Sequence, residues 1–187
     1  MNHPQTAKPG VPKILPILIA LILGGMYYMA AYVDISTPER TINEFYQAYF
    51  DKDYNTVADN LSVFWSVNIL PQYQNQSASE LLQKRDEIVK EAAAALKSSE
   101  ANLPPQDSLS VEVLKEYTKS GEYSALVIYQ VMDKKEPVQK EVAFLIKEAG
   151  AYKVINFSPI DDSDLELVKD YRLDELDNSF KILLGVQ

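Results

Sequence analysis

Few side chains of this 187-residue chain are suited to acid–base or nucleophilic chemistry. The chain has no cysteine, which removes disulfides, thiolate metal sites and cysteine nucleophiles. Its one histidine, His3, lies in the N-terminal tail, where we expect it to be solvated. A glycine-rich phosphate loop, a G-x-S-x-G motif and an H-E-x-x-H motif are all absent. The sequence therefore predicts no metal and no cofactor.

Acidic residues dominate the charge of the chain. The net charge of -9 disfavours phosphate backbones, so we expect no nucleic-acid partner. Asp161, Asp162 and Asp164 are close enough in sequence to hold a calcium ion, but they lack the glycine-bearing loop of a calcium hand. A solvated cap at the start of a helix is the interpretation we favour for them.

Residues 14–33 carry no charge, and a helix of 20 residues is long enough to cross a hydrocarbon layer of about 30 Å. Lys8 and Lys13 precede this run, three tyrosines gather near its C-terminal end, and the first acid, Asp34, follows it. Both the basic flank and the tyrosines favour an N-terminus in the cytoplasm. We predict a cytoplasmic tail (1–13), a single-pass anchor in the cell membrane (14–33) and an extracytoplasmic domain. The alternative is a signal peptide cleaved near Ala31, although the apolar run exceeds the usual length.

Three helices are expected after the anchor. Thr37 and Pro38 are typical of a helix start, and the helix should end near Asp51. Its apolar residues recur at three- and four-residue steps: Ile42, Phe45, Tyr46, Tyr49 and Phe50. A second helix is expected over 54–64, and a third over 79–97, opened by Ser79 and Glu80.

Four strands are expected over 109–117, 123–132, 138–147 and 152–157, and their short links favour antiparallel neighbours. The second run is apolar on both faces, which predicts cover on both sides. In the third run one face should be core and the other wetter. The set expected on the core face is Val138, Lys140, Val142, Phe144 and Ile146. The set expected on the wetter face is Gln139, Glu141, Ala143, Leu145 and Lys147.

The C-terminal segment 163–184 has apolar residues at helical spacing among acids. Such a tail would be unfavourable if left free in water. It is expected either to pack back on the sheet, as its second cover, or to dock on a partner.

Three helices followed by a four-stranded meander over residues 36–158 resemble the nuclear transport factor 2-like superfamily, also called cystatin-like. TPERTINEFYQAYFDKDYNTVADNL at 37–61 is similar to the opening helices of bacterial members. FLIKEAGAYKVINF at 144–157 is similar to their final hairpin, with Tyr152 where many relatives have tryptophan. The resemblance implies a cone in which the helices pack on a curved antiparallel sheet. Dehydratases, isomerases, ligand carriers and assembly modules share this fold, so it does not fix the activity.

Enzymes of that superfamily typically use an aspartate with a histidine, or an aspartate base with a tyrosine donor, inside the cone. The histidine route is closed here. In the second route, Asp53 or Asp59 would have to turn inward to meet a tyrosine, because the sequence offers no obvious buried acid. The candidate lining of the cone is aromatic: Tyr46, Tyr49, Trp65, Tyr129 and Phe144.

The sequence therefore predicts an α+β protein with an N-terminal transmembrane helix, a cone domain over 36–158 and an acidic helical extension over 159–187. We expect a membrane-anchored binding or assembly module of the cell envelope, with no catalytic residues. Its architecture also resembles that of assembly-factor subunits of type IV secretion machines. Expected partners are a protein or a second copy, and a small apolar ligand is a further candidate. The alternative is a small-molecule isomerase or dehydratase.

Overall fold

The computed structural model describes residues 14–28, 36–104, 106 and 108–186, which fall into two compact units divided after Ile35. In the first unit, α1 (Ile14–Tyr28) is a helix of 15 residues without a charged side chain. Within the described residues, no helix combines the length and the apolar character needed to cross a membrane. Residues 1–13 and 29–33, which complete the predicted cytoplasmic tail and anchor, lie outside the described residues.

The second unit is α+β, as predicted, and begins with α2 (Pro38–Phe50). The Thr37 side chain accepts a hydrogen bond from the Arg40 N–H at 3.3 Å, which caps this helix at the predicted place. Ile42 and Phe45 on one side of the helix are buried against the sheet.

The predicted second helix is divided in two, α3 (Tyr54–Asn60) and α4 (Val63–Ser66). The interruption has a tertiary cause, because the Ser62 N–H donates to the Val154 carbonyl at 2.9 Å instead of continuing the helix.

The predicted third helix is also divided, into α5 (Ala78–Gln83) and α6 (Arg85–Ser99), after the short turn η2 (Pro71–Tyr73). It begins at Ala78, one residue earlier than predicted, because Ser77 rather than Ser79 is the cap and forms a capping box with Glu80. These elements bury their own apolar cluster together with α4, centred on Leu70, Tyr73 and Ile88.

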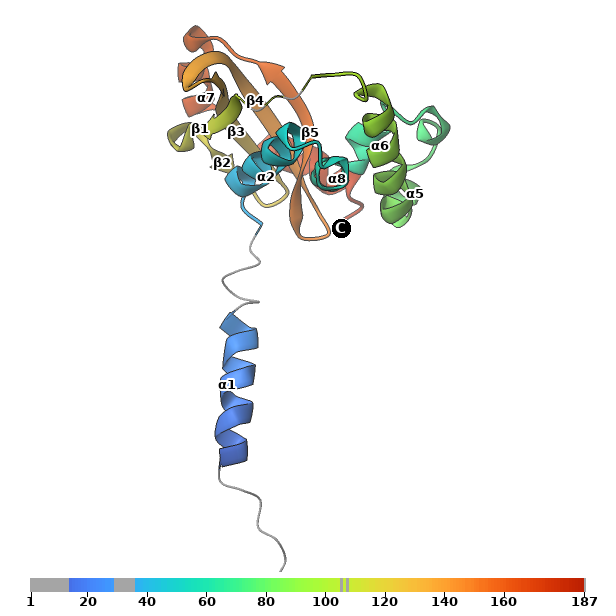
Figure 1. Cartoon of the computed structure of the whole chain (residues 1–187), viewed down its shortest axis with the longest axis vertical. Coiled ribbons are helices and arrows are strands. Elements are labelled where there is room, and N and C mark those ends of the chain that lie inside the picture. The colour runs from blue at the N-terminus through green and yellow to red at the C-terminus, as the bar shows by residue number, and fades with distance from the viewer. Residues whose placement is uncertain (1–13, 29–35, 105, 107, 187) are drawn as a thin grey trace, which may run out of the picture. The chain divides into compact units, whose positions relative to one another are not determined.

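The sheet is antiparallel, with strands in the order β1-β3-β4-β5 (Figure 1). Its strands are β1 (Leu109–Val113), β2 (Lys119–Ser120), β3 (Ser124–Asp133), β4 (Glu136–Glu148) and β5 (Ala151–Pro159). The predicted meander is confirmed, but the first strand is shorter than expected. The chain leaves it for a single turn, η3 (Lys115–Tyr117), before β2 pairs with the start of β3.

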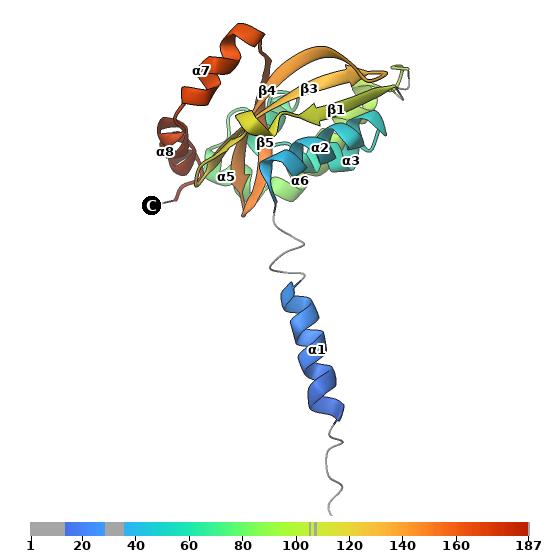
Figure 2. The ribbon, with the colours of Figure 1, turned by 90° about the vertical axis from the view of Figure 1, so that its left-hand side faces the viewer.

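The sheet is covered on both faces, as the apolar residues of β3 predicted. The helix face carries Ala125, Val127 and Tyr129 against α2 and α3. On the opposite face, which we call the tail face, Leu126 and Ile128 pack against the C-terminal tail. Figure 2 shows the sheet between these two layers.

The C-terminal tail follows the first of its two predicted alternatives and packs on its own sheet. It consists of the turn η4 (Asp162–Asp164), α7 (Leu165–Asp170) and α8 (Asp174–Leu183). Leu165 and Val168 are buried in the tail-face cluster. Asp177 binds the β2–β3 turn, where it accepts hydrogen bonds from the N–H groups of Glu122 at 2.8 Å and Tyr123 at 3.1 Å.

The division of the third predicted strand into a core face and a wetter face was wrong. Ala143 and Leu145, assigned to the wetter face, are fully buried on the helix face. Val142 and Phe144 lie on the tail face beneath the tail. Both faces of β4 are therefore core over its second half, since helices cover one and the tail covers the other.

Candidate functional site

The candidate site is a cavity of about 300 Å³ on the helix face, which we call the aromatic pocket. Helices α2, α3 and α6, the α4 segment, and strands β4 and β5 all contribute to its wall. Its lining residues are Phe45, Tyr46, Tyr49, Val57, Leu61, Trp65, Leu96, Glu100, Glu141 and Phe157.

Aromatic rings form a continuous wall around this pocket. Phe157 lies between Trp65 and Phe45, with ring centroids 5.9 Å from each. Phe45 meets Tyr46 edge-on at 5.1 Å and stacks in parallel with Tyr49 at 6.4 Å. Phe45 is buried, whereas the other four rings are partly exposed. The wall is therefore accessible from solvent, unlike the interior of a filled core.

A carboxylate and two tyrosine hydroxyls meet at the floor of the pocket. The Tyr46 hydroxyl lies 2.8 Å from the Tyr129 hydroxyl and donates to Oε2 of Glu141 at 2.9 Å. The Tyr129 hydroxyl donates to the same oxygen, and the Gln139 side chain donates to Oε1 at 2.8 Å. Both oxygens of Glu141 thus accept hydrogen bonds from the protein.

The two tyrosines at this floor are held in their neutral form. Burial raises the pKa of Tyr46 and Tyr129 well above the usual tyrosine value, and the Glu141 carboxylate adds to the effect. Both hydroxyls therefore act as hydrogen-bond donors at physiological pH.

A second carboxylate, Glu100, lies at the C-terminal end of α6 and also lines the pocket. Partial burial raises the pKa of Tyr49, and the Glu100 charge contributes to that rise. Burial, and after it the Glu100 charge, also raises the pKa of Tyr54. The pocket thus carries one carboxylate at its floor and another beside Tyr49.

Four of the five predicted lining residues come together at this site. Tyr46, Tyr49 and Trp65 line the pocket, and Tyr129 contacts its floor through Glu141. Phe144 does not, and its assignment to the lining was wrong. Its side chain packs in the tail-face cluster because neighbouring positions of a strand point to opposite faces.

Neither aspartate considered as a base reaches the pocket. Asp53 caps α3, where its carboxylate accepts from the Thr56 N–H at 3.3 Å. Asp59 instead binds Arg85 at 2.8 Å and Lys153 at 3.1 Å. The acid that sequence reasoning missed is Glu141, and the signal for it was the register, since Glu141 pairs directly with Tyr129 across β3 and β4.

No family model, curated protein or solved structure matches the chain.

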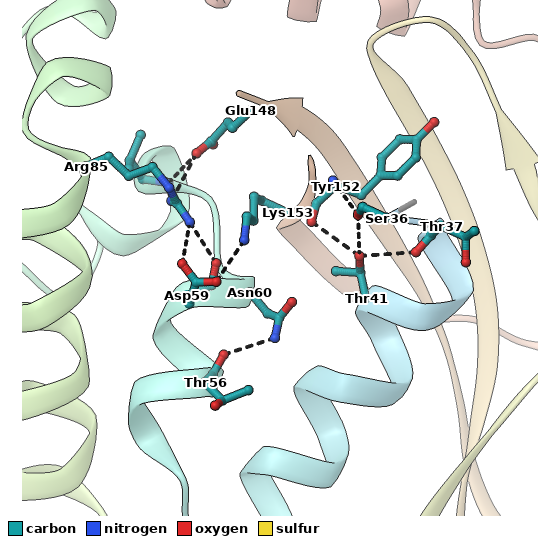
Figure 3. A network of polar contacts seen from close by, with 11 residues as sticks. Ser36, Thr37, Thr41, Thr56, Asp59, Asn60, Arg85, Glu148, Tyr152 and Lys153 are labelled. Atoms are coloured by element: carbon teal, nitrogen blue, oxygen red, sulfur yellow. Dashed lines mark hydrogen bonds and ion pairs between the residues drawn. The ribbon is translucent and has the colours of Figure 1, made fainter. Parts of the chain in front are cut away.

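A separate polar network ties α3 and α6 to the sheet (Figure 3). Glu148, at the end of β4, is 1% exposed and accepts hydrogen bonds from the Ser62 hydroxyl and, at 3.5 Å, from Arg85. Arg85 continues the network to Asp59, which binds Lys153. Burial raises the pKa of Glu148, against the opposing effect of the Ser62 hydrogen bond and the Arg85 charge. Each member has protein partners, which indicates a structural role.

Asp161 and Asp164 of the acidic cluster stand at the starts of η4 and α7 but form no side-chain cap hydrogen bond there. Asp162 forms an ion pair with Lys140 of β4. In the part of the chain that the structure describes, no group of three or more histidine or acidic side chains is placed to hold a metal ion.

A larger hollow of about 540 Å³ lies between α2 and β1 and is lined mainly by polar side chains, including Asn43, Gln47 and Asp51. It lacks the ring wall and the buried hydroxyl–carboxylate group of the aromatic pocket. We therefore regard the aromatic pocket as the candidate site.

Proposed function

We propose that this protein is a membrane-tethered binding module without catalytic activity, and that its folded domain lies outside the cytoplasm and binds a ligand or partner group in the aromatic pocket. The observation that carries the binding role is the pocket wall, in which four partly exposed rings surround about 300 Å³ beside two carboxylates. Concave apolar sites with a few convergent polar groups are typical of ligand binding.

The tether in this proposal rests on the sequence. The uncharged run 14–33 has the length of a bilayer span, with Lys8 and Lys13 before it and the acidic domain after it. Within the domain, helices followed by an antiparallel meander support the proposed membership of the nuclear transport factor 2-like superfamily. A domain held at a membrane surface in this way suits a subunit of a cell-envelope complex.

Single-cysteine labelling tests the tether and its orientation, because the natural chain has no cysteine. Asn178→Cys, at an exposed position of α8, should react in intact bacterial cells with a maleimide that cannot cross membranes. Gln5→Cys should react only after the cells are broken, and the protein should stay in the membrane through a carbonate wash. Labelling of Gln5→Cys in intact cells, or a soluble product that begins after Ala31, would contradict the proposal.

Fragment screening by NMR tests the binding role. Small molecules that bind the full chain in detergent should shift the signals of pocket residues, and these shifts should disappear in Leu96→Phe. Leu96 lines the pocket, so the added ring fills it. Leu167→Phe, at an exposed position of α7, is the matched control and should bind as the natural protein does. Binding that survives Leu96→Phe would place the ligand elsewhere.

The enzyme alternative is favoured by one specific observation, the Glu141 carboxylate in contact with the hydroxyls of Tyr46 and Tyr129. A carboxylate base and a tyrosine donor are the parts of a proton-transfer site. Here, however, the hydroxyls donate to the carboxylate itself rather than to a separate point in the cavity. A donor and a base occupied with each other leave neither free for a substrate, so the geometry favours binding.

Exchange of ligand hydrogens with D₂O distinguishes a proton-transfer enzyme from a binding module. A proton-transfer enzyme exchanges a carbon-bound hydrogen of its ligand with D₂O, and Glu141→Gln would abolish that exchange. We expect bound ligands to keep their hydrogens over hours in D₂O, as followed by mass spectrometry. Exchange that depends on Glu141 would establish the enzyme in place of the binding module.

A further inference from the structure

We propose that the aromatic pocket selects a small organic cation, of the alkylammonium class. The inference rests on the proposed binding function and names the ligand class that the same site takes.

The first support is the type of surface. A cation is attracted to the face of an aromatic ring, most strongly to tryptophan, when it lies within about 6 Å of the centroid. Trp65, Phe157, Phe45 and Tyr49 form a wall whose successive ring centroids are 5.9 to 6.4 Å apart. A single small ligand inside about 300 Å³ would therefore contact several of these rings at once.

The second support is charge. Among the described residues, the lining contains two carboxylates, Glu100 and Glu141, and no lysine, arginine or histidine. A ligand that covers these carboxylates must replace their water. A neutral apolar ligand would not compensate for the lost water, and an anion would be repelled, whereas an ammonium group could pair with Glu100 and would be attracted by the Glu141 charge, whose oxygens are already hydrogen-bonded within the protein.

The two tyrosine hydroxyls at the floor add to this selection. Both hydroxyls point their hydrogens at Glu141, and of the two residues only Tyr46 lines the pocket, so Tyr46 presents an electron-rich oxygen and ring there while Tyr129, which is fully buried, holds the Glu141 carboxylate in place from beneath. Oxygen lone pairs and ring faces are both electron-rich surfaces. The floor, the aromatic wall and Glu100 thus all favour a positively charged ligand.

The fluorescence emission of Trp65 reports on the pocket directly, because Trp65 lines the site and is the one tryptophan of the chain. The experiment titrates the full chain, in an uncharged maltoside detergent, with choline and with 3,3-dimethyl-1-butanol. The second compound has the shape of choline but carbon in place of the charged nitrogen. We expect saturable changes in emission from both, with choline roughly 5- to 30-fold tighter, the range that cation–π contacts of about 1–2 kcal/mol give.

Charge variants complete the test. Glu100→Gln should weaken choline several-fold without weakening the neutral compound, whereas Glu136→Gln, the same change on the exposed β3–β4 hairpin, should alter neither. Equal affinity for both compounds would overturn the cation inference and leave the binding function intact. A choline affinity unaffected by Glu100→Gln would overturn it as well. If neither compound changes the emission of Trp65, the inference is wrong, and the fragment screen with Leu96→Phe then decides separately whether the pocket binds anything.

Discussion

The Asp177 carboxylate fastens α8 to the β2–β3 turn, and we predict that Asp177→Asn releases the C-terminal tail from the sheet. The carboxylate accepts hydrogen bonds from the N–H groups of Glu122 and Tyr123 and, at 2.5 Å, from the Ser124 hydroxyl. Burial alone would raise the pKa of Asp177, but these three hydrogen bonds outweigh it and lower the pKa. The ionised form is therefore the one that holds the tail.

The size of the effect follows from these bonds. A hydrogen bond to a charged group contributes about 1.5–3 kcal/mol. Because the Asp177 carboxylate is only partly buried, we expect a total loss of about 2–3 kcal/mol rather than the sum of three such bonds. The stabilisation is present above the usual aspartate pKa and is lost as the pH falls through the lowered pKa of Asp177.

Gly121 provides a second way to disturb the same contact. A Cβ at Gly121 would lie 2.2 Å from Oδ2 of Asp177, so Gly121→Ala forces the carboxylate away from its donors. The two substitutions act on one set of hydrogen bonds. The double variant should therefore lose little more than either single variant.

Hydrogen exchange read by mass spectrometry measures the release directly. Protection of the 165–183 segment should fall roughly 30- to 150-fold in Asp177→Asn, the factor that about 2–3 kcal/mol gives. Asp174→Asn is the matched control, since it removes the same charge from the first turn of α8 and loses only an exposed pair with Arg172. Equal protection in the two aspartate variants, or fully additive losses with Gly121→Ala, would refute the fastening role of Asp177.

Three further predictions concern the core and its buried polar groups. Phe45→Ala should lower the free energy of unfolding by about 3–5 kcal/mol in urea titrations, with Phe45→Leu as the milder control, because Phe45 is 6% exposed among three other rings; a loss below 1 kcal/mol would show that the position is not packed. Tyr129→Phe should cost about 1–3 kcal/mol, since it removes a donor to Glu141, and an unchanged urea midpoint would contradict that. Glu148 has a raised pKa in the folded state, so its contribution to stability is complete below the usual glutamate pKa of roughly 4.3 and declines as the pH rises through the raised value. Glu148→Gln should lack this decline, and parallel stability–pH curves for the two proteins would refute the assignment.

The sequence was most informative where local signals and packing agree. Thr37 and Pro38 fixed the start of α2 because a cap and a proline act within one turn. The apolar residues on both faces of β3 predicted a second cover for the sheet, and the tail provides it. These features depend on the spacing of apolar residues and on helix capping, and both can be read from the amino-acid sequence.

Features set by distant residues could not be predicted in this way. The break at Ser62 depends on the Val154 carbonyl and on Glu148, both far away in the sequence. The Glu141 site was missed for a related reason. A glutamate in an alternating strand is normally assigned to solvent, but here tyrosine hydroxyls on a neighbouring strand and on α2 satisfy its carboxylate under the helices.

The helix face of the sheet keeps an open pocket rather than a filled core. Acrylamide quenching of Trp65 emission tests it most directly, because no other tryptophan contributes. We predict clear quenching in the folded full chain, lowered by choline and by Leu96→Phe, which both occupy the space beside Trp65. Emission that acrylamide does not quench, and that Leu96→Phe leaves unchanged, would mean that the rings around Trp65 form a closed core.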